Sequence, residues 1–216
     1  TLLVNDLIKE DPAIKVNMPK IHEKTIVRLD VDEVAQLLDE VESGESLTSR
    51  QQMYHERTKT RDMAILTLLL GTGIRVSELR YFTVEAIRYG EVTVDCKNKT
   101  RTILVPGKLK NILLNYAKRH GITSGVIFIT RTGNPLNRSN IWSAMKKLCE
   151  AAGVKPSKVF PHNLRKLFAR IFYGIEKDIA KLADILGHSS INTTRIYVCS
   201  TGAQHRKQLE NMDLVL

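Results

Sequence analysis

Cysteine is scarce in this sequence. Its three cysteines, Cys96, Cys149 and Cys199, form no C-x-x-C pair. An odd number of cysteines without that spacing argues against a disulfide framework and against a zinc site built from cysteines. We therefore expect free thiols in a reducing compartment, and no bound metal.

Long apolar runs are also missing. No stretch approaches the roughly 20 consecutive apolar residues that a membrane-spanning helix needs, and the first residues do not have the composition of a signal peptide. Internal repeats and low-complexity tracts are absent from the sequence as well. We expect a protein of the cytoplasm with no membrane partner.

Positive charge is what the sequence has in excess. Lys and Arg number 33 against 23 Asp and Glu, which gives a formal net charge of +10. Such a chain favours a polyanionic partner, because each phosphate that it neutralises releases condensed counterions. Nucleic acid, and with it an association with the nucleoid, is the favoured interpretation. A basic protein with no nucleic-acid partner is the alternative.

Apolar periodicity predicts helices in the first third of the chain. Asp30 and Glu33 have the spacing of a capping box, so a helix is expected to begin there. Residues 44–60 are polar and form either an exposed loop or the start of a helix. Residues 61–74 have the composition of a buried helix, which is expected to end at Gly71 or Gly73.

β-Branched residues predict one pair of strands. Two such runs within residues 91–106 flank a polar Lys-Asn-Lys-Thr turn, and Pro106 is expected to end the second strand. The other expected elements are a short helix from residue 76, a helix at 107–119, a short strand at 126–130, and helices at 137–152, 161–174, 176–187, 189–198 and 202–212. The expected fold class is therefore mainly α with a small antiparallel β-sheet (α+β).

The segment GTGIRVSEL combines a glycine turn with Arg75 and Glu78. A G-x-G pair alone is weak support for a nucleotide site. Here it follows a helical pattern instead of a strand, so the dinucleotide-binding interpretation fails. Taken alone, Arg75 would be a solvated arginine at the start of a helix.

The segment PHNLRKLFARIFY places His162 and Arg165 three residues apart on an expected helix. Residues at this spacing emerge on the same face. An arginine fork can bind two phosphate oxygens, and a histidine can accept or donate a proton, so the pair could address one phosphate. A surface helix with ion pairs would look similar.

The segment LADILGHSSINTTRIYV places His188 directly after a helix that ends at Gly187. Tyr197 follows nine residues later, after a polar stretch suited to capping a new helix. A lone histidine at such a turn is most often a cap or a surface group. A lone tyrosine at this spacing is most often a half-buried core residue.

Together these segments resemble the catalytic domain of the tyrosine recombinases, the lambda-integrase family, over roughly residues 28 to 200. The resemblance rests on G-x-R-x-S-E-L, on H-x-x-R and on L-G-H-x-x-x-x-T-x-x-Y, where Thr194 occupies the threonine position. It implies the catalytic residues Arg75, Lys97, His162, Arg165, His188 and Tyr197, with Glu78 as structural support of the site. It also suggests, more weakly, an integrase of a conjugative transposon.

Two positions depart from the family pattern. Lys166 stands where the family often has a histidine after the H-x-x-R arginine. The hairpin turn differs by about one residue from the commonest form, so Lys99 competes with Lys97 for the role of the family's hairpin lysine.

The resemblance also implies a domain organisation. Residues 30–200 correspond to the catalytic domain, and residues 1–29 to a linker and the remnant of an N-terminal DNA-clamping domain. The sequence begins at Thr1 without Met, and we expect a fragment of a longer protein. Residues 201–216 form a C-terminal tail that docks either on its own domain or on a neighbouring protomer.

The implied reaction needs neither metal nor cofactor. Two arginines would neutralise the scissile phosphate, with His188 adding a hydrogen bond. Because a tyrosine hydroxyl has an ordinary pKa near 10, it needs a base, for which His162 is the candidate. Lys97 would protonate the leaving 5′ oxygen. The family's product is a 3′-phosphotyrosine bond, which a second DNA strand attacks within a tetramer on two duplexes.

Two other functions remain open from the sequence. A type IB topoisomerase uses related chemistry without exchanging partners, and a catalytically inactive DNA-binding module could keep the fold. A metal-dependent transposase would need a carboxylate trio, which the sequence does not group together. The sequence does not identify the DNA site that is recognised. It also leaves open whether the protein is a mobile-element integrase, which inserts or excises DNA, or a chromosome-dimer resolvase.

Overall fold

A computed structural model of the chain describes residues 28–45, 48–96, 99–130 and 132–198. Its elements are α1 Val31–Ser43, α2 Ser49–Thr72, the 3-10 helix η2 Val76–Tyr81, α3 Val84–Tyr89, β1 Glu91–Cys96, β2 Lys99–Leu104, α4 Gly107–Arg119, α5 Arg138–Ala151, α6 Pro161–Glu176, α7 Ile179–Leu186 and α8 Ile191–Val198. The mainly α fold with one small antiparallel sheet is confirmed. No described helix is long and apolar enough to cross a bilayer.

Helix α1 begins where its capping residues predict. The Asp30 backbone N–H donates to the Glu33 carboxylate at 3.0 Å, and the Asp30 side chain accepts from the Glu33 backbone in return. These bonds satisfy backbone donors that a helix N-terminus leaves without partners. The helix ends at Gly44, whose φ of 65° is the left-handed conformation that glycine adopts most readily.

Residues 44–60, for which the sequence allowed either an exposed loop or the start of a helix, lie largely in helix α2. It begins at Ser49 and continues to Thr72, so most of that polar segment is helical. The C-terminal half of α2 carries buried apolar residues, among them Leu68 and Leu69. The helix stops at Gly73, which has a φ of 60°. The last turn of α2 thus lies in the core, and the chain leaves it at a sharp turn.

The strands β1 and β2 form the expected hairpin, in a register that runs from Glu91 opposite Leu104 to Cys96 opposite Lys99. Val92 and Val94 are fully buried, whereas their neighbours face solvent, as the period of two in a strand requires. The chain leaves the sheet before Pro106, and α4 occupies Gly107–Arg119, the range predicted from the sequence.

The predicted strand at 126–130 is wrong. Only isolated bridges occur there, between Thr83 and Val126 and between Ile129 and Pro135. Ile127 and Phe128 are almost fully buried. Their apolar character therefore reflects core packing beside residues 82–84, where the Ile127 N–H donates to the Phe82 carbonyl at 3.0 Å.

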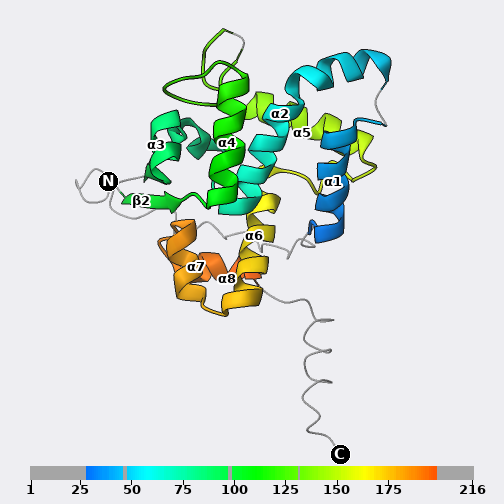
Figure 1. The fold of residues 1–216 in the computed structure, drawn as a ribbon. Helices are drawn as coiled ribbons and strands as arrows, with labels where there is room; N and C mark the ends of the chain where they lie inside the picture. The colour runs from blue at the N-terminus through cyan, green and yellow to red at the C-terminus, as the bar shows by residue number, and fades with distance from the viewer. Residues whose placement is uncertain (1–27, 46–47, 97–98, 131, 199–216) are drawn as a thin grey trace, which may run out of the picture.

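Helices α6, α7 and α8 form a lower layer beneath α2 and α4, with β2 next to α7 (Figure 1). The first turns of α6 pack in the main core through Leu164 and Leu167. Its later turns contribute Ala169 to a second cluster with Leu182 and Leu186 of α7. Helix α6 therefore connects the two clusters. The helix expected at 202–212 lies outside the described residues.

Candidate active site

Arg75 lies directly after the turn that ends α2. Ile74 beside it is fully buried, which fixes the chain as it enters the 3-10 helix η2. Arg75 is the N-cap residue of η2, and its side chain is 39% exposed. Its guanidinium donates to a Glu78 carboxylate oxygen, Oε1, at 3.0 Å. The turn thus presents a partly exposed arginine whose orientation is set by a carboxylate.

Glu78 is the carboxylate that orients Arg75, and it is completely buried. Its Oε2 accepts the Arg75 backbone N–H at 2.7 Å and an Arg101 guanidinium N–H at 2.7 Å. Burial by itself would raise the pKa of Glu78. The Arg75 backbone bond and the charges of Arg101 and Arg75 outweigh it, so the pKa lies below its ordinary value. Glu78 is therefore a buried anion held by two arginines.

Arg165 comes from the first turns of α6 and is only 1% exposed. Its guanidinium donates to the carbonyl of Gly73 at 2.6 Å and to the carbonyl of Leu186 at 2.5 Å. Its Nε is buried and has no hydrogen-bond partner in the described part of the chain. Burial and the nearby charge of Arg75 lower the pKa of Arg165 to about 10, which leaves the guanidinium charged at neutral pH.

His188 follows α7 and makes a contact with each ring nitrogen. Its Nε2 lies 3.1 Å from an Arg165 guanidinium nitrogen, and its Nδ1 lies 2.8 Å from the Thr194 hydroxyl. An arginine can only donate, so Nε2 must carry a lone pair and Nδ1 the proton. Burial and the charges of Arg165, Arg75 and Arg101 lower the pKa of His188 to about 4, which agrees with this neutral form.

Tyr197 lies between two histidines. The centroid of its ring is 5.1 Å from those of His162 and His188, and both imidazoles stand nearly perpendicular to it. Its hydroxyl lies 3.4 Å from Nδ1 of His162, the distance of a long hydrogen bond. Burial and the charges of Lys166, Arg165 and Arg75 lower the pKa of His162, so the ring is neutral at pH 7 and can accept a proton.

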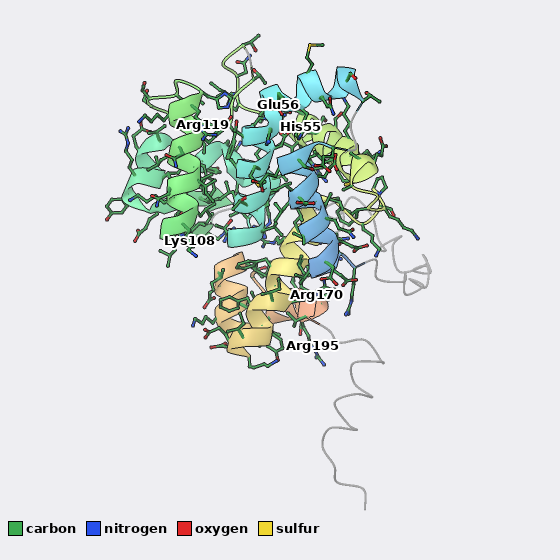
Figure 2. All side chains as sticks on the ribbon, turned by 45° about the vertical axis from the view of Figure 1, so that its right-hand side comes forward. His55, Glu56, Lys108, Arg119, Arg170 and Arg195 are labelled. Atoms are coloured by element: carbon green, nitrogen blue, oxygen red, sulfur yellow. The ribbon has the colours of Figure 1, made fainter. Side chains whose placement is uncertain are left out.

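Further positive side chains border Tyr197. Arg28, Lys166 and Arg170 line a small hollow against Tyr197. Arg170 also donates to the carbonyl of Leu29, just before α1, and Figure 2 places its side chain where α6 approaches α1. Cationic groups from residue 28 and from α6 thus lie beside Tyr197.

Arg101 is a site residue that the motifs did not indicate. It lies on β2, and it joins Glu78 to the carbonyl of Ile185 near the end of α7. One sequence signal could have found it. Ile103 and Val105 are buried and stand at positions two and four residues further along, so strand alternation places Arg101 on the inward face.

The hairpin lysine is the one expected site residue that is not placed. Lys97 lies outside the described residues, and Lys99 is described only as the first residue of β2, opposite Cys96. The structure therefore brings together Arg75, Glu78, His162, Arg165, His188 and Tyr197. Within the described ranges no three His, Cys, Asp or Glu side chains are grouped as metal ligands.

This arrangement can bind an anion and deliver a nucleophile to it. The tyrosine hydroxyl contacts a neutral imidazole, and the site also contains two arginines and further cations that line a hollow with Tyr197. The groups come from the start of η2, from α6, from the turn between α7 and α8 and, for Tyr197, from α8, so each lies on or beside a packed element.

Known proteins resemble this chain in sequence. The model of a family described as the phage integrase family matches residues 8–203. A relative, the tyrosine recombinase XerA of Pyrococcus furiosus, is 30% identical over 212 residues, which are 95% of this chain and 68% of the relative. The chain thus spans about two thirds of the length of this curated relative.

Solved structures share the fold. A crystal structure of XerA recombinase has a TM-score of 0.70 at 24% identity, covering 92% of this chain and 68% of that one. The Tn1549 transposon integrase in complex with a circular intermediate DNA has a TM-score of 0.70 at 17% identity, covering 97% of this chain and 74% of that one.

Proposed function

The chain belongs to the phage integrase family and is a site-specific tyrosine recombinase, and we propose that Tyr197 is the residue that attacks DNA. One observation carries this assignment. The Tyr197 hydroxyl contacts His162, and its ring packs against His188, which is itself bonded to Arg165. A type IB topoisomerase and an inactive module are not favoured, because the relatives are recombinases.

We propose double-stranded DNA as the substrate, and the Tn1549 integrase, whose structure is a complex with a circular intermediate DNA, supports DNA as the partner. The net charge of +10 favours this partner, and Arg28, Lys166 and Arg170 beside Tyr197 would bind phosphates of the backbone. A tetramer on two duplexes remains part of the proposal. The insertion or excision of a mobile element is also a proposal. The similarity to the Tn1549 transposon integrase, at 17% identity, shows a shared fold and not a shared role.

Arg75 and Arg165 would hold the two non-bridging oxygens of the scissile phosphate. Arg165 supports this role, because it is a buried cation whose guanidinium donates to two neutral carbonyl groups and contacts the neutral ring of His188. A phosphate would place a negative charge directly against the Arg165 guanidinium, whose hydrogen bonds go to neutral groups in the described residues. The same charge would raise the pKa of His188, whose Nε2 could then be protonated and donate to the phosphate.

In the cleavage step the Tyr197 oxygen forms a bond to phosphorus and the bond from phosphorus to the 5′ oxygen breaks. His162 takes the phenol proton, and its lowered pKa supports this role, because a neutral imidazole has a lone pair to offer. Lys97 gives a proton to the 5′ oxygen. A 5′ hydroxyl of a second strand then attacks the 3′-phosphotyrosine and regenerates the tyrosine.

Replacing Tyr197 by Phe tests the nucleophile. On a nicked suicide substrate, from which the released strand diffuses away, the wild-type chain should accumulate a covalent protein–DNA adduct. The Y197F chain should form none yet bind the same duplex with similar affinity, because only a hydroxyl is removed. An adduct that persists in Y197F would place the nucleophile elsewhere.

The hairpin lysine is tested with a modified leaving group. Lys97→Ala should block cleavage of an ordinary phosphodiester but spare a 5′-phosphorothiolate, because a thiolate leaves without being protonated. Lys99→Ala is the matched control and should cleave both substrates. The opposite pattern would assign the acid to Lys99, and a Lys97→Ala chain that cleaves neither substrate would remove the lysine from this role.

A further inference from the structure

Arg101 contacts two separate parts of the site. Its Nη2 donates to Oε2 of Glu78 at 2.7 Å, and its Nη1 donates to the carbonyl of Ile185 in the last turn of α7. Its side chain is 13% exposed. An arginine fork that is buried in this way fixes the two acceptors relative to one another, because its donors lie in a rigid plane.

The first contact acts on Arg75. Glu78 Oε2 accepts both from Arg101 and from the Arg75 backbone, and Oε1 accepts from the Arg75 guanidinium. The position of the carboxylate therefore determines the direction of the Arg75 side chain. Without Arg101, the fully buried Glu78 would lose a charged donor at Oε2, and the position of its carboxylate would be less well determined.

The second contact acts on Arg165. The carbonyls of Ile185 and Leu186 are adjacent at the end of α7, where helix carbonyls have no partner within the helix. Arg101 takes the first and Arg165 takes the second. The two arginines thus hold the same helix end from neighbouring points, and α7 cannot shift without moving both.

The packing at Gly187 shows how closely Arg101 approaches this turn. A Cβ added at Gly187 would lie 2.4 Å from Cδ of Arg101. The residue also has a φ of 64°, so it is a glycine for both steric and conformational reasons. His188 follows immediately, which places the Arg101 side chain against the turn that carries an expected phosphate ligand.

We propose that Arg101 is a positioning residue that holds Arg75, through Glu78, and Arg165, through the end of α7, at the spacing required to bind one phosphate. We do not assign it as a phosphate ligand, because its charge is already paired with the Glu78 carboxylate, whereas Arg165 donates to neutral carbonyl groups. This inference rests on the proposed function, in which those two arginines neutralise the scissile phosphate.

The test compares the cleavage rate of Arg101→Ala with that of the wild-type chain on three duplexes that the wild-type chain cleaves. They carry a phosphodiester, a methylphosphonate or a 5′-phosphorothiolate at the cleavage site. Because a small misplacement of catalytic groups costs on the order of 100-fold in rate, we expect a loss of that size on the phosphodiester. On the methylphosphonate, which has no charge to neutralise, the loss should be less than about tenfold, since misplaced arginines matter less there.

Two variants control for charge and geometry. Arg119→Ala removes an exposed positive charge at the upper end of α4, far from α6 (Figure 2), and should cleave at the wild-type rate. Arg101→Lys keeps the charge but loses the fork, so it should show most of the Arg101→Ala loss. Rates are taken per folded molecule, from chains whose thermal unfolding has been measured.

Three outcomes would overturn the inference. The first is that Arg101→Ala cleaves the phosphodiester at the wild-type rate. The second is an equal loss of rate on the phosphodiester and the methylphosphonate, which would indicate a general structural role. The third is that Arg101→Ala regains the wild-type cleavage rate on the 5′-phosphorothiolate, which would indicate that Arg101 acts through the lysine that protonates the leaving group. If the wild-type chain forms no tyrosine adduct, the proposed function fails first and this inference fails with it. A normal adduct together with any of the earlier outcomes overturns only the role of Arg101.

Discussion

At the scale of single residues, His188 provides a prediction about pH. Its pKa is lowered to about 4 by burial and by neighbouring arginines, against an ordinary value near 6.5. We expect its ring proton signals in NMR, identified by their loss in His188→Asn, to titrate well below pH 6. A midpoint at or above 6.5 would contradict the neutral ring inferred from the Arg165 contact.

The same shift has a consequence for stability. The unfolded chain binds a proton at this histidine more readily than the folded one, so the His188 contribution is present above pH 6.5 and is lost as the pH falls toward 4. Denaturant unfolding between these pH values should show a smaller loss of the free energy of unfolding in His188→Asn than in the wild type. Equal pH dependence in the two chains would refute the linkage.

Tyr197 could be predicted from the sequence, whereas Arg101 could not. The motif residues could be predicted because the chain resembles a family, residue by residue. Lone tyrosines and histidines at the same spacing would have favoured a core or surface role. Arg101 lies outside the three motifs on which the resemblance rests. Its role arises from contacts with Glu78 and Ile185, which are 23 and 84 residues away in the sequence.

At the scale of elements, the turn between α2 and the 3-10 helix should be sensitive to substitution. Gly73 has a φ of 60°, its carbonyl accepts from Arg165, and an added Cβ would lie 2.4 Å from Phe168. Gly73→Ala should therefore destabilise the fold by about 1–3 kcal/mol in denaturant unfolding, from backbone strain and crowding. It should also slow cleavage, because the carbonyl that holds Arg165 moves.

Gly71 offers the matched control two residues earlier. It lies within α2, and an added Cβ would meet Leu109 at the ordinary contact distance of 3.5 Å. Gly71→Ala should stabilise the chain by about 0.5–1 kcal/mol through helix propensity and leave cleavage unchanged. If both substitutions have the same effect, the special role of the Gly73 turn is wrong.

Elements with strong local signals could be predicted from the sequence. Capping residues located the start of α1, Pro106 separated the sheet from α4, and β-branched runs gave the hairpin. Residues 126–130 have the same apolar composition as a strand but lack a neighbour to pair with, since residues 82–84 offer only one bridge. Pairing depends on residues distant in sequence, which a local pattern cannot contain.

At the scale of the whole molecule, the site depends on contacts between remote segments. Arg165 donates to Gly73, 92 residues earlier, and to Leu186, 21 residues later. The net charge predicted the kind of partner but not where the positive groups would gather. Packing of α6 across both apolar clusters brings His162 and Arg165 to the end of α2 and to the turn after α7, and this follows from the assembled core.

The central claim is that Tyr197 forms the covalent bond with DNA, and mapping the adduct tests it most directly. Covalent complexes trapped on a suicide substrate are digested with trypsin and nuclease and analysed by mass spectrometry. Cleavage after Arg195 and Arg206 gives a peptide of residues 196–206 that contains Tyr197 as its one tyrosine, and Tyr173 falls in a separate peptide, 171–177. We predict nucleotides joined through a 3′ phosphate to Tyr197, and a free 5′ hydroxyl on the other strand end. Nucleotides on another tyrosine, or joined through a 5′ phosphate, would contradict the account.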